Sequence, residues 1–178
     1  MLKKKAVLDK VQCDVELNPV NMLSGLKLKP EPTHIEITLT ETSGDFFPDM
    51  YSTPITLMSD VLKKGFDQCG ITNIDFSPVT LSDAKNNRKI NGYWFANVLG
   101  RFSCLDESKS DIRRNALGNL KFKSFCIDES KIMGAEVFSL DERARMIIIN
   151  ERVYRSLSEL NLKGVLIKNT RDFDGYGI

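Results

Sequence analysis

The single histidine in the sequence, His34, limits the chemistry that this chain can perform. It excludes metal sites built from several histidines and leaves one imidazole for nucleophilic catalysis. His34 lies in the run Thr33–Glu41, where Ile35, Ile37 and Leu39 alternate with polar residues. This alternation predicts a half-buried strand with His34 on its polar face. Neither a Ser/Asp nor a Cys/Asn constellation is apparent around it, so we expect no catalytic role for this residue.

Three pairs of adjacent carboxylates are the next candidates for chemistry: Asp106-Glu107, Asp128-Glu129 and Asp141-Glu142. General acid–base catalysis needs two carboxyls that can share a proton. Neighbours on a strand point to opposite faces, and neighbours on a helix diverge by about 100°. Ser108 and Ser130 directly follow two of the pairs, as is typical of turns and helix caps. The pairs therefore indicate structural roles.

Cysteines and glycines point to no cofactor or metal site. The four cysteines, Cys13, Cys69, Cys104 and Cys126, form no C-x-x-C pair and lie in apolar stretches, as is typical of buried free thiols. No glycine-rich phosphate loop is present. Residues 172–177 superficially resemble a calcium loop, but the sequence has no ligand at the required twelfth position. We therefore predict that the protein is not an enzyme and uses no cofactor.

The charge balance argues against a dedicated nucleic-acid binder. The 178 residues carry 25 basic and 24 acidic side chains, a formal net charge of +1, whereas such proteins have a marked basic excess. One basic cluster near two phenylalanines, Phe122 and Phe125, leaves the alternative open: Lys109, Arg113, Arg114, Lys121 and Lys123. Asp106, Glu107 and Asp111 would balance it on an ordinary solvated face. A small nucleic-acid-associated regulator that uses this Lys109–Lys123 patch is our second hypothesis.

The elements that must position these residues indicate an α+β or mixed α/β fold, with a twisted mixed sheet and few helices. Aromatic and β-branched runs predict strands at 92–99, 120–127, 135–140 and 145–149, and we expect a short helix at 108–118. The length fits one domain, or two lobes of about residues 1–90 and 91–178. Neither a signal peptide nor a membrane span of roughly 20 apolar residues is apparent, so we expect a cytoplasmic protein.

Two segments, residues 55–79 and 146–168, predict a repeated strand–helix–strand unit. Ser59 and Asn150 are both good N-caps, and an acidic residue follows each of them at the positive end of the helix dipole. Matching apolar stripes come next, formed by Leu62, Phe66 and Cys69 in one unit and by Val153, Leu157 and Leu160 in the other. Gly70 and Asn161 then match as left-handed helix ends, and closing strands are expected at 73–76 and 164–167.

A series of short segments carries a family resemblance: 47–49, 57–60, 74–79, 92–98, 104–110, 127–130, 136–141, 147–151 and 162–165. They begin with Phe47-Pro48-Asp49 and Leu57-Met58-Ser59-Asp60 and end with Leu162-Lys163-Gly164-Val165. Their order resembles immunity family eleven of bacterial polymorphic toxin systems, over about residues 45–168. The second helix begins with Asn150 where a serine is expected, but both residue types cap helices.

This resemblance implies a non-enzymatic protein that binds and neutralises a cognate toxin or effector encoded nearby, without nucleic-acid or membrane partners. Tight protein inhibitors rely on aromatic and arginine anchors. Two segments offer such side chains as candidates for partner binding: Arg143, Arg145, Arg152, Tyr154 and Arg155, and the tail residues Asp172, Phe173, Asp174 and Tyr176. The tail, from Arg171 onward, follows the last predicted strand, so we expect the two segments to form one continuous patch. We also expect few core positions beyond Ile167. The sequence leaves the oligomeric state of the protein open.

Overall fold

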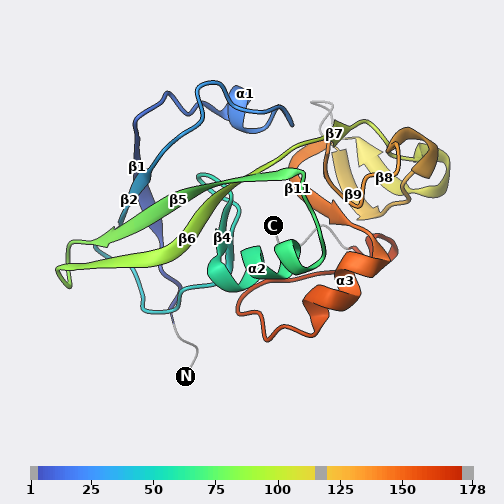
Figure 1. The fold of residues 1–178 in the computed structure, drawn as a ribbon. Helices are drawn as coiled ribbons and strands as arrows, with labels where there is room; N and C mark the ends of the chain where they lie inside the picture. Colours follow the sequence, from blue (N-terminus) through green and yellow to red (C-terminus); the bar gives the residue numbers. More distant parts are fainter. Residues whose placement is uncertain (1–3, 115–119, 174–178) are drawn as a thin grey trace.

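The computed structural model describes residues 4–114 and 120–173. Its largest element is a curled, mixed six-stranded sheet with the order β1-β2-β5-β6-β4-β3 (Figure 1). The strands are β1 (Leu8–Cys13), β2 (Ile35–Leu39), β3 (Met50–Tyr51), β4 (Leu57–Ser59), β5 (Ile74–Asp83) and β6 (Arg88–Val98). β2 and β5 pair in parallel, and the other neighbours pair antiparallel. The described chain is mostly sheet with few helices, which agrees with the predicted mixed fold.

Strand β2 shows why the alternating sequence around it forms half-buried sheet. Ile35, Ile37 and Leu39 are buried in the first core cluster, whereas Glu36 and Thr38 on the other face stay partly exposed. His34, just before the strand, is exposed. The predicted strand and the polar setting of the histidine are both confirmed.

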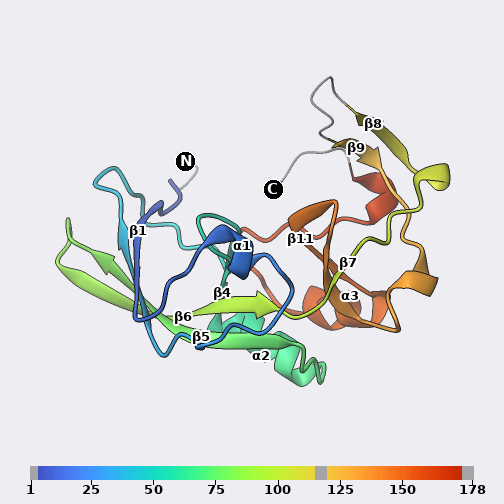
Figure 2. The same cartoon turned by 90° about the horizontal axis from the view of Figure 1, so that it is seen from above.

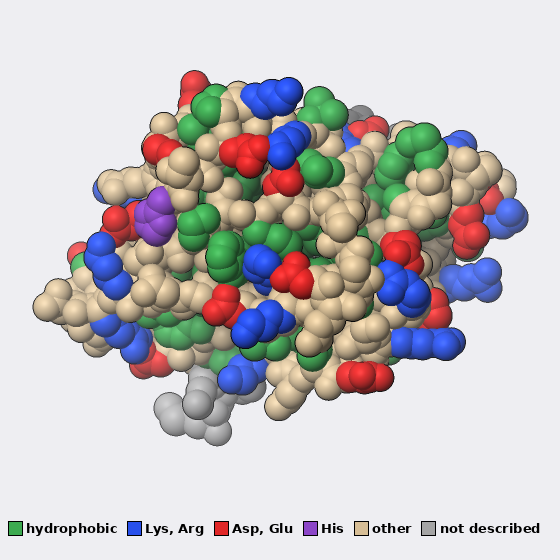
Figure 3. Space-filling model, in the orientation of Figure 1, with side chains coloured by type: hydrophobic (Ala, Val, Ile, Leu, Met, Phe, Trp, Pro, Cys, Tyr) green, Lys and Arg blue, Asp and Glu red, His purple; other side chains and the backbone are tan. Residues whose placement is uncertain are grey.

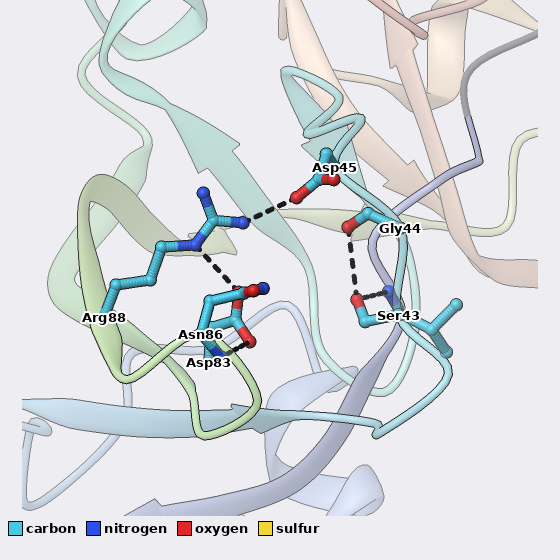
Figure 4. A network of polar contacts seen from close by, with 7 residues as sticks. Ser43, Gly44, Asp45, Asp83, Asn86 and Arg88 are labelled. Carbon is cyan, nitrogen blue, oxygen red and sulfur yellow. Dashed lines mark hydrogen bonds and ion pairs between the residues drawn. The ribbon is translucent and has the colours of Figure 1, made fainter.

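The long β5–β6 hairpin is fixed at its tip by a network of polar contacts (Figure 4). Asp83, which is buried, accepts hydrogen bonds from Asn86 Nδ2 and Arg88 Nε, both at 2.8 Å. These contacts, with Asn86 first, lower the pKa of Asp83. The guanidinium of Arg88 also reaches Asp45 at 2.8 Å, so it joins the hairpin to the loop that precedes β3.

The rest of the chain builds two smaller sheets. One has the order β11-β10-β7 and contains β7 (Arg101–Phe102), β10 (Val137–Leu140) and β11 (Arg143–Ile149). The other pairs β8 (Asp111–Arg114) with β9 (Leu120–Ser124), and it lies at the opposite end of the molecule from the β5–β6 tip in both views (Figures 1 and 2). Asn73 Nδ2 donates to the carbonyls of Leu99 at 2.7 Å and Val137 at 2.8 Å, which links the start of β5 to β10.

The predicted helix at 108–118 is wrong. Residues 107–109 form a single 3-10 turn, η1 (Glu107–Lys109), and strand β8 follows; residues 115–118 lie outside the described part of the chain. Ile112 pairs with the buried Phe122 across the hairpin, while Arg113 points outward. The segment has few apolar residues, which suits a strand better than a helix. Side chains of a strand alternate between two faces, so one inward-facing apolar residue is enough to pack this short strand against the core.

Three α-helices occur in the described residues: α1 (Pro19–Met22), α2 (Asp60–Gln68) and α3 (Glu151–Ser158). α2 and α3 pack together in the second core cluster, which includes Phe66 and Leu157. Gly65 permits their close approach, since a Cβ at this position would lie 2.6 Å from Leu160 Cδ1 and 2.7 Å from Leu157 Cδ2.

The repeated strand–helix–strand unit is not confirmed, although both helices form as predicted. Ser59 Oγ accepts from the Leu62 amide, and Asn150 Oδ1 accepts from the Val153 amide, so both N-caps act as expected. Gly70 has the left-handed φ of +70°. Asn161 does not adopt a positive φ, and residues 164–167 form no strand. Only the strand and the capped helix recur, because residues 164–167 pair with no strand.

The buried carboxylate of Asp49 holds the segment that follows α3. Asp49 Oδ1 accepts from Ser59 Oγ at 2.5 Å, and Oδ2 accepts from the Lys163 amide at 2.6 Å. The Asp49 amide in turn donates to the Lys163 carbonyl at 2.7 Å. Asp49 therefore connects the N-cap of α2 to the segment that leaves α3, and we call this arrangement the Asp49 clamp.

Replacing Asp49 with alanine is expected to destabilise the fold strongly. The buried Ser59 hydroxyl would lose its acceptor at a cost of about 1–3 kcal/mol, and the partly buried Lys163 amide would lose its acceptor at a lower cost. Asp45→Ala is the matched control, because Asp45 is exposed and contributes one surface ion pair, worth less than about 1 kcal/mol. Urea unfolding followed by circular dichroism measures both changes. Equal midpoints for the two variants would contradict a structural role of the Asp49 clamp.

Candidate functional site

A hollow of about 490 Å³ lies where α3, β11, the loop 126–135 and the segment 167–171 meet. Its apolar lining includes Ile127, Ile132, Phe138, Ile148 and Ile149. Its polar lining includes Glu129, Glu151, Tyr154 and Arg171, all of which are exposed. An apolar centre with a polar, solvent-accessible margin is the usual anatomy of a protein-binding surface.

A second hollow, of about 410 Å³, is lined in part by residues 164–168 and adjoins the first, with which it shares Ile148, Ile149 and Ile167. Several of its lining side chains, including Met58, Phe66 and Leu157, are buried members of the second core cluster. Arg145, which also lines it, donates to the carbonyls of Ser52 at 2.7 Å and Pro54 at 3.2 Å. The first hollow is the better candidate for binding, because it brings together the exposed residues Tyr154 and Arg171 from the two segments proposed for partner binding.

Helix α3 presents Tyr154 to the first hollow because its neighbours are turned inward. Val153 and Leu157 are four residues apart on one helix face, and both are buried in the second core cluster. Tyr154 lies about 100° further round the helix and is 42% exposed. The tyrosine thus offers a large aromatic surface on a rigid helix, which is a common property of binding anchors.

The Glu136–Arg152 pair holds the start of α3 in place. Arg152 donates from Nε to Glu136 Oε1 at 2.6 Å and from Nη2 to Oε2 at 2.5 Å. Asn150 Nδ2 donates to the same carboxylate at 2.8 Å. These contacts, with Arg152 first, lower the pKa of Glu136 to about 2. Arg152 Nη2 also donates to the Cys69 carbonyl at the end of α2, so this arginine joins the two helices.

The other arginines proposed as anchors have different surroundings. Arg143 lies over the rings of Phe122 and Phe173, at 5.9 Å and 5.8 Å from their centroids. Arg155 forms an exposed ion pair with Glu151 at 3.0 Å, one helical turn away. Three of the four arginines, Arg143, Arg145 and Arg152, therefore make contacts that join elements of the fold, and Arg155 is the most exposed.

The tail is tied to the body by Phe173. Its buried ring packs edge-on against Phe122 and Phe125 in the third core cluster, so one core position lies beyond Ile167. Asp172 is exposed in the 3-10 turn η3 (Thr170–Asp172). Asp174 and Tyr176 lie outside the described residues. A deletion that probes the tail has to keep Phe173, because its loss would also remove core packing.

The structure brings the two proposed segments together at two points. Arg143 contacts Phe173, and Tyr154 and Arg171 line the same hollow. Sequence reasoning missed the opposite wall, formed by Ile127, Ile132 and other residues of the loop 126–135. The apolar run Ile132-Met133-Gly134-Ala135 in an otherwise polar connection was the available signal.

The basic patch of the alternative hypothesis is divided in the structure. Phe122 and Phe125 are buried, so their rings are not available to stack on bases. Lys109 pairs with Asp106 at 2.9 Å, and Ser108 also donates to that carboxylate, as predicted for a turn. Arg113, Lys121 and Lys123 are exposed on the β8–β9 hairpin. On the face shown in Figure 3, basic and acidic side chains are interspersed.

Groups that could perform other chemistry are scattered. Within residues 4–114 and 120–173, no three His, Cys, Asp or Glu side chains are grouped to hold a metal ion. The four cysteines are free, and burial raises the pKa of Cys104 to about 11. Cys69 and Cys104 are buried as expected, whereas Cys13 and Cys126 are partly exposed. In the same part of the chain, no helix is long and apolar enough to cross a membrane.

Residues 27–172 match the model of a family described as "Immunity protein family (Imm11)". No curated protein matches the chain.

The titration of Glu136 tests the geometry at the start of α3. Its lowered pKa means that its contacts stabilise the fold fully above the ordinary value of 4.5, and that this contribution is lost as pH falls from about 4.5 to about 2. Arg152→Ala should move the pKa of Glu136 back toward 4.5, while the control Arg155→Ala should leave it unchanged. Carboxyl NMR shifts recorded against pH measure both. An unchanged Glu136 titration in Arg152→Ala would contradict the pairing.

Proposed function

The chain belongs to the Imm11 immunity protein family, and from this we propose that it binds and neutralises a cognate bacterial toxin and so protects the cell that makes both. The match spans residues 27–172, which is most of the chain, and agrees with the resemblance found in the sequence. In this proposal the protein acts by stoichiometric binding in the cytoplasm, and the toxin is encoded by a neighbouring gene.

The observation that best supports a binding role is the hollow beside Tyr154. A protein that inhibits by binding needs a rigid surface with a few well-placed anchors, and it needs no reactive group. Tyr154 and Arg171 line one recess with an apolar centre, and they come from two elements that the fold holds in place. We therefore assign the toxin-binding surface to this recess, and we include Arg155 and Asp172 as exposed charges at its margin.

Charge at this surface would act mainly on the rate of association. Glu151, Arg155, Arg171 and Asp172 are exposed, and exposed charges steer encounter more than they add to final affinity. Arg143, Arg145 and Arg152 would act indirectly, because they hold β11, α3 and the chain end in position. The tail residues Asp174 and Tyr176 stay part of the proposed surface.

Coexpression with the toxin tests the proposed function. We expect the protein to abolish the toxicity of the neighbouring gene product and to form a stoichiometric complex with it, as seen by size-exclusion chromatography. Full toxicity without a complex would refute the proposal. Binding of DNA or RNA with a steep dependence on salt concentration would instead favour the regulator hypothesis, through Arg113, Lys121 and Lys123.

Tyr154→Ala is expected to weaken toxin binding at least about thirtyfold, as loss of an interface hot spot of about 2 kcal/mol or more would do. Val61→Ala is a matched control, since Val61 is 46% exposed on α2, outside the hollow. Titration calorimetry with purified toxin measures both, and thermal unfolding confirms that each variant is folded. Equal affinities for Tyr154→Ala and the wild type would remove the hollow from the interface.

A further inference from the structure

A tight turn at the edge of the hollow exposes a methionine in an unfavourable backbone conformation. In the turn Ile132–Ala135, the Ala135 amide donates to the Ile132 carbonyl at 2.9 Å. Met133 and Gly134 between them have φ angles of +50° and +77°. Two consecutive positive φ values define a type I′ turn, which strongly prefers Asn-Gly or Asp-Gly at its centre.

Neither the backbone conformation nor burial of the side chain explains why a methionine stands at position 133. A bulky side chain at positive φ is a steric outlier, because its Cβ crowds the backbone. The only other described residue of this kind that is not glycine is Asn87, in the β5–β6 turn, and asparagine tolerates this region well. Met133 is 84% exposed, so its side chain adds almost nothing to the core. Strain that the fold does not need points to a functional cause.

The turn is held firmly at both ends. Before it, the Asp128 amide donates to the Cys104 carbonyl at 2.7 Å, and the Asp128 carboxylate accepts from the Ser130 hydroxyl at 2.6 Å. After it, Glu136 is held by Asn150 and Arg152. Ile132 and Ala135, on either side of the central pair, both line the hollow. Met133 is therefore presented on a fixed support at the edge of the candidate binding surface.

We propose that Met133 is a binding anchor that enters an apolar pocket on the surface of the toxin. This inference rests on the proposed function. A methionine side chain is flexible and polarisable, and it fills irregular apolar pockets well. A protein is the partner that fits best, because the exposed methionine is apolar and the charges beside the turn are nearly balanced. Lys131 pairs with Asp128 and Arg152 pairs with Glu136, while Glu129 adds one further negative charge. This leaves no basic excess that would attract the phosphates of a nucleic acid or of an anionic membrane.

The proposal predicts that Met133→Asn raises the stability of the protein and lowers its affinity for the toxin. Met133→Asn creates the Asn-Gly pair that the turn prefers, so it should raise the midpoint of thermal unfolding by about 2–4 °C. The same change removes the apolar anchor, so it should weaken binding to the purified toxin at least about tenfold. Met133→Leu, which keeps an apolar side chain of similar volume, should bind within about threefold of the wild type.

Leu26→Asn is the matched control, because Leu26 is 69% exposed and lies outside the residues that line the hollow. It should leave toxin affinity unchanged. A Met133→Asn variant that binds the toxin as tightly as the wild type would overturn the anchor while leaving the proposed function intact. A lowered unfolding midpoint in this variant would refute the strain on which the inference depends. A wild-type protein that fails to bind the toxin would instead refute the proposed function itself.

Discussion

The buried carboxylate of Asp49 is the constraint on which the candidate site depends. Its two oxygens accept hydrogen bonds from Ser59 and from the amide of Lys163, so the start of α2 and the chain after α3 share one anchor. From Lys163 the chain continues to the segment 167–171, which lines the hollow, and then to Phe173 in the third core cluster. Without this anchor the segment would depend on its later contacts, which are the hydrogen bond from the Phe125 amide to the Thr170 carbonyl at 2.9 Å and the packing of Phe173.

The surroundings of the arginines are the reason why the proposed interface relies on aromatic and apolar groups. A guanidinium has five donors and is costly to desolvate without acceptors. In this fold Arg145 donates to two carbonyls, and Arg152 donates to a carboxylate and a carbonyl. Such contacts stabilise the junctions between elements, but they use the same donors that a partner would need. Tyr154 has no such role in the described contacts and keeps its exposed surface.

Much of the fold could be predicted from the sequence where the signals are local. Caps such as Ser59 and Asn150, the apolar stripe of α3 and the alternation of β2 all depend on neighbours within a few residues. The failures depend on distant partners. The β8 strand forms because β9 pairs with it, and residues 164–167 find no strand partner. The hollow could not be predicted by local reasoning for the same reason, since its walls come from residues 126–138, 148–154 and 167–171, which are far apart in the sequence.

The hollow beside Tyr154 and the exposed side chain of Met133 together would limit which toxins the protein can bind. In the proposed complex the hollow beside Tyr154 would accept a group from the toxin, whereas Met133 would need a pocket on the toxin. The two features are joined through Glu136, which follows the Met133 turn and holds Asn150 and Arg152 at the start of α3, so their separation is fixed. A partner must therefore satisfy both at one spacing. A related toxin that fits only one loses the other contact and leaves an apolar group in water, and this difference in free energy is how a rigid surface discriminates between partners.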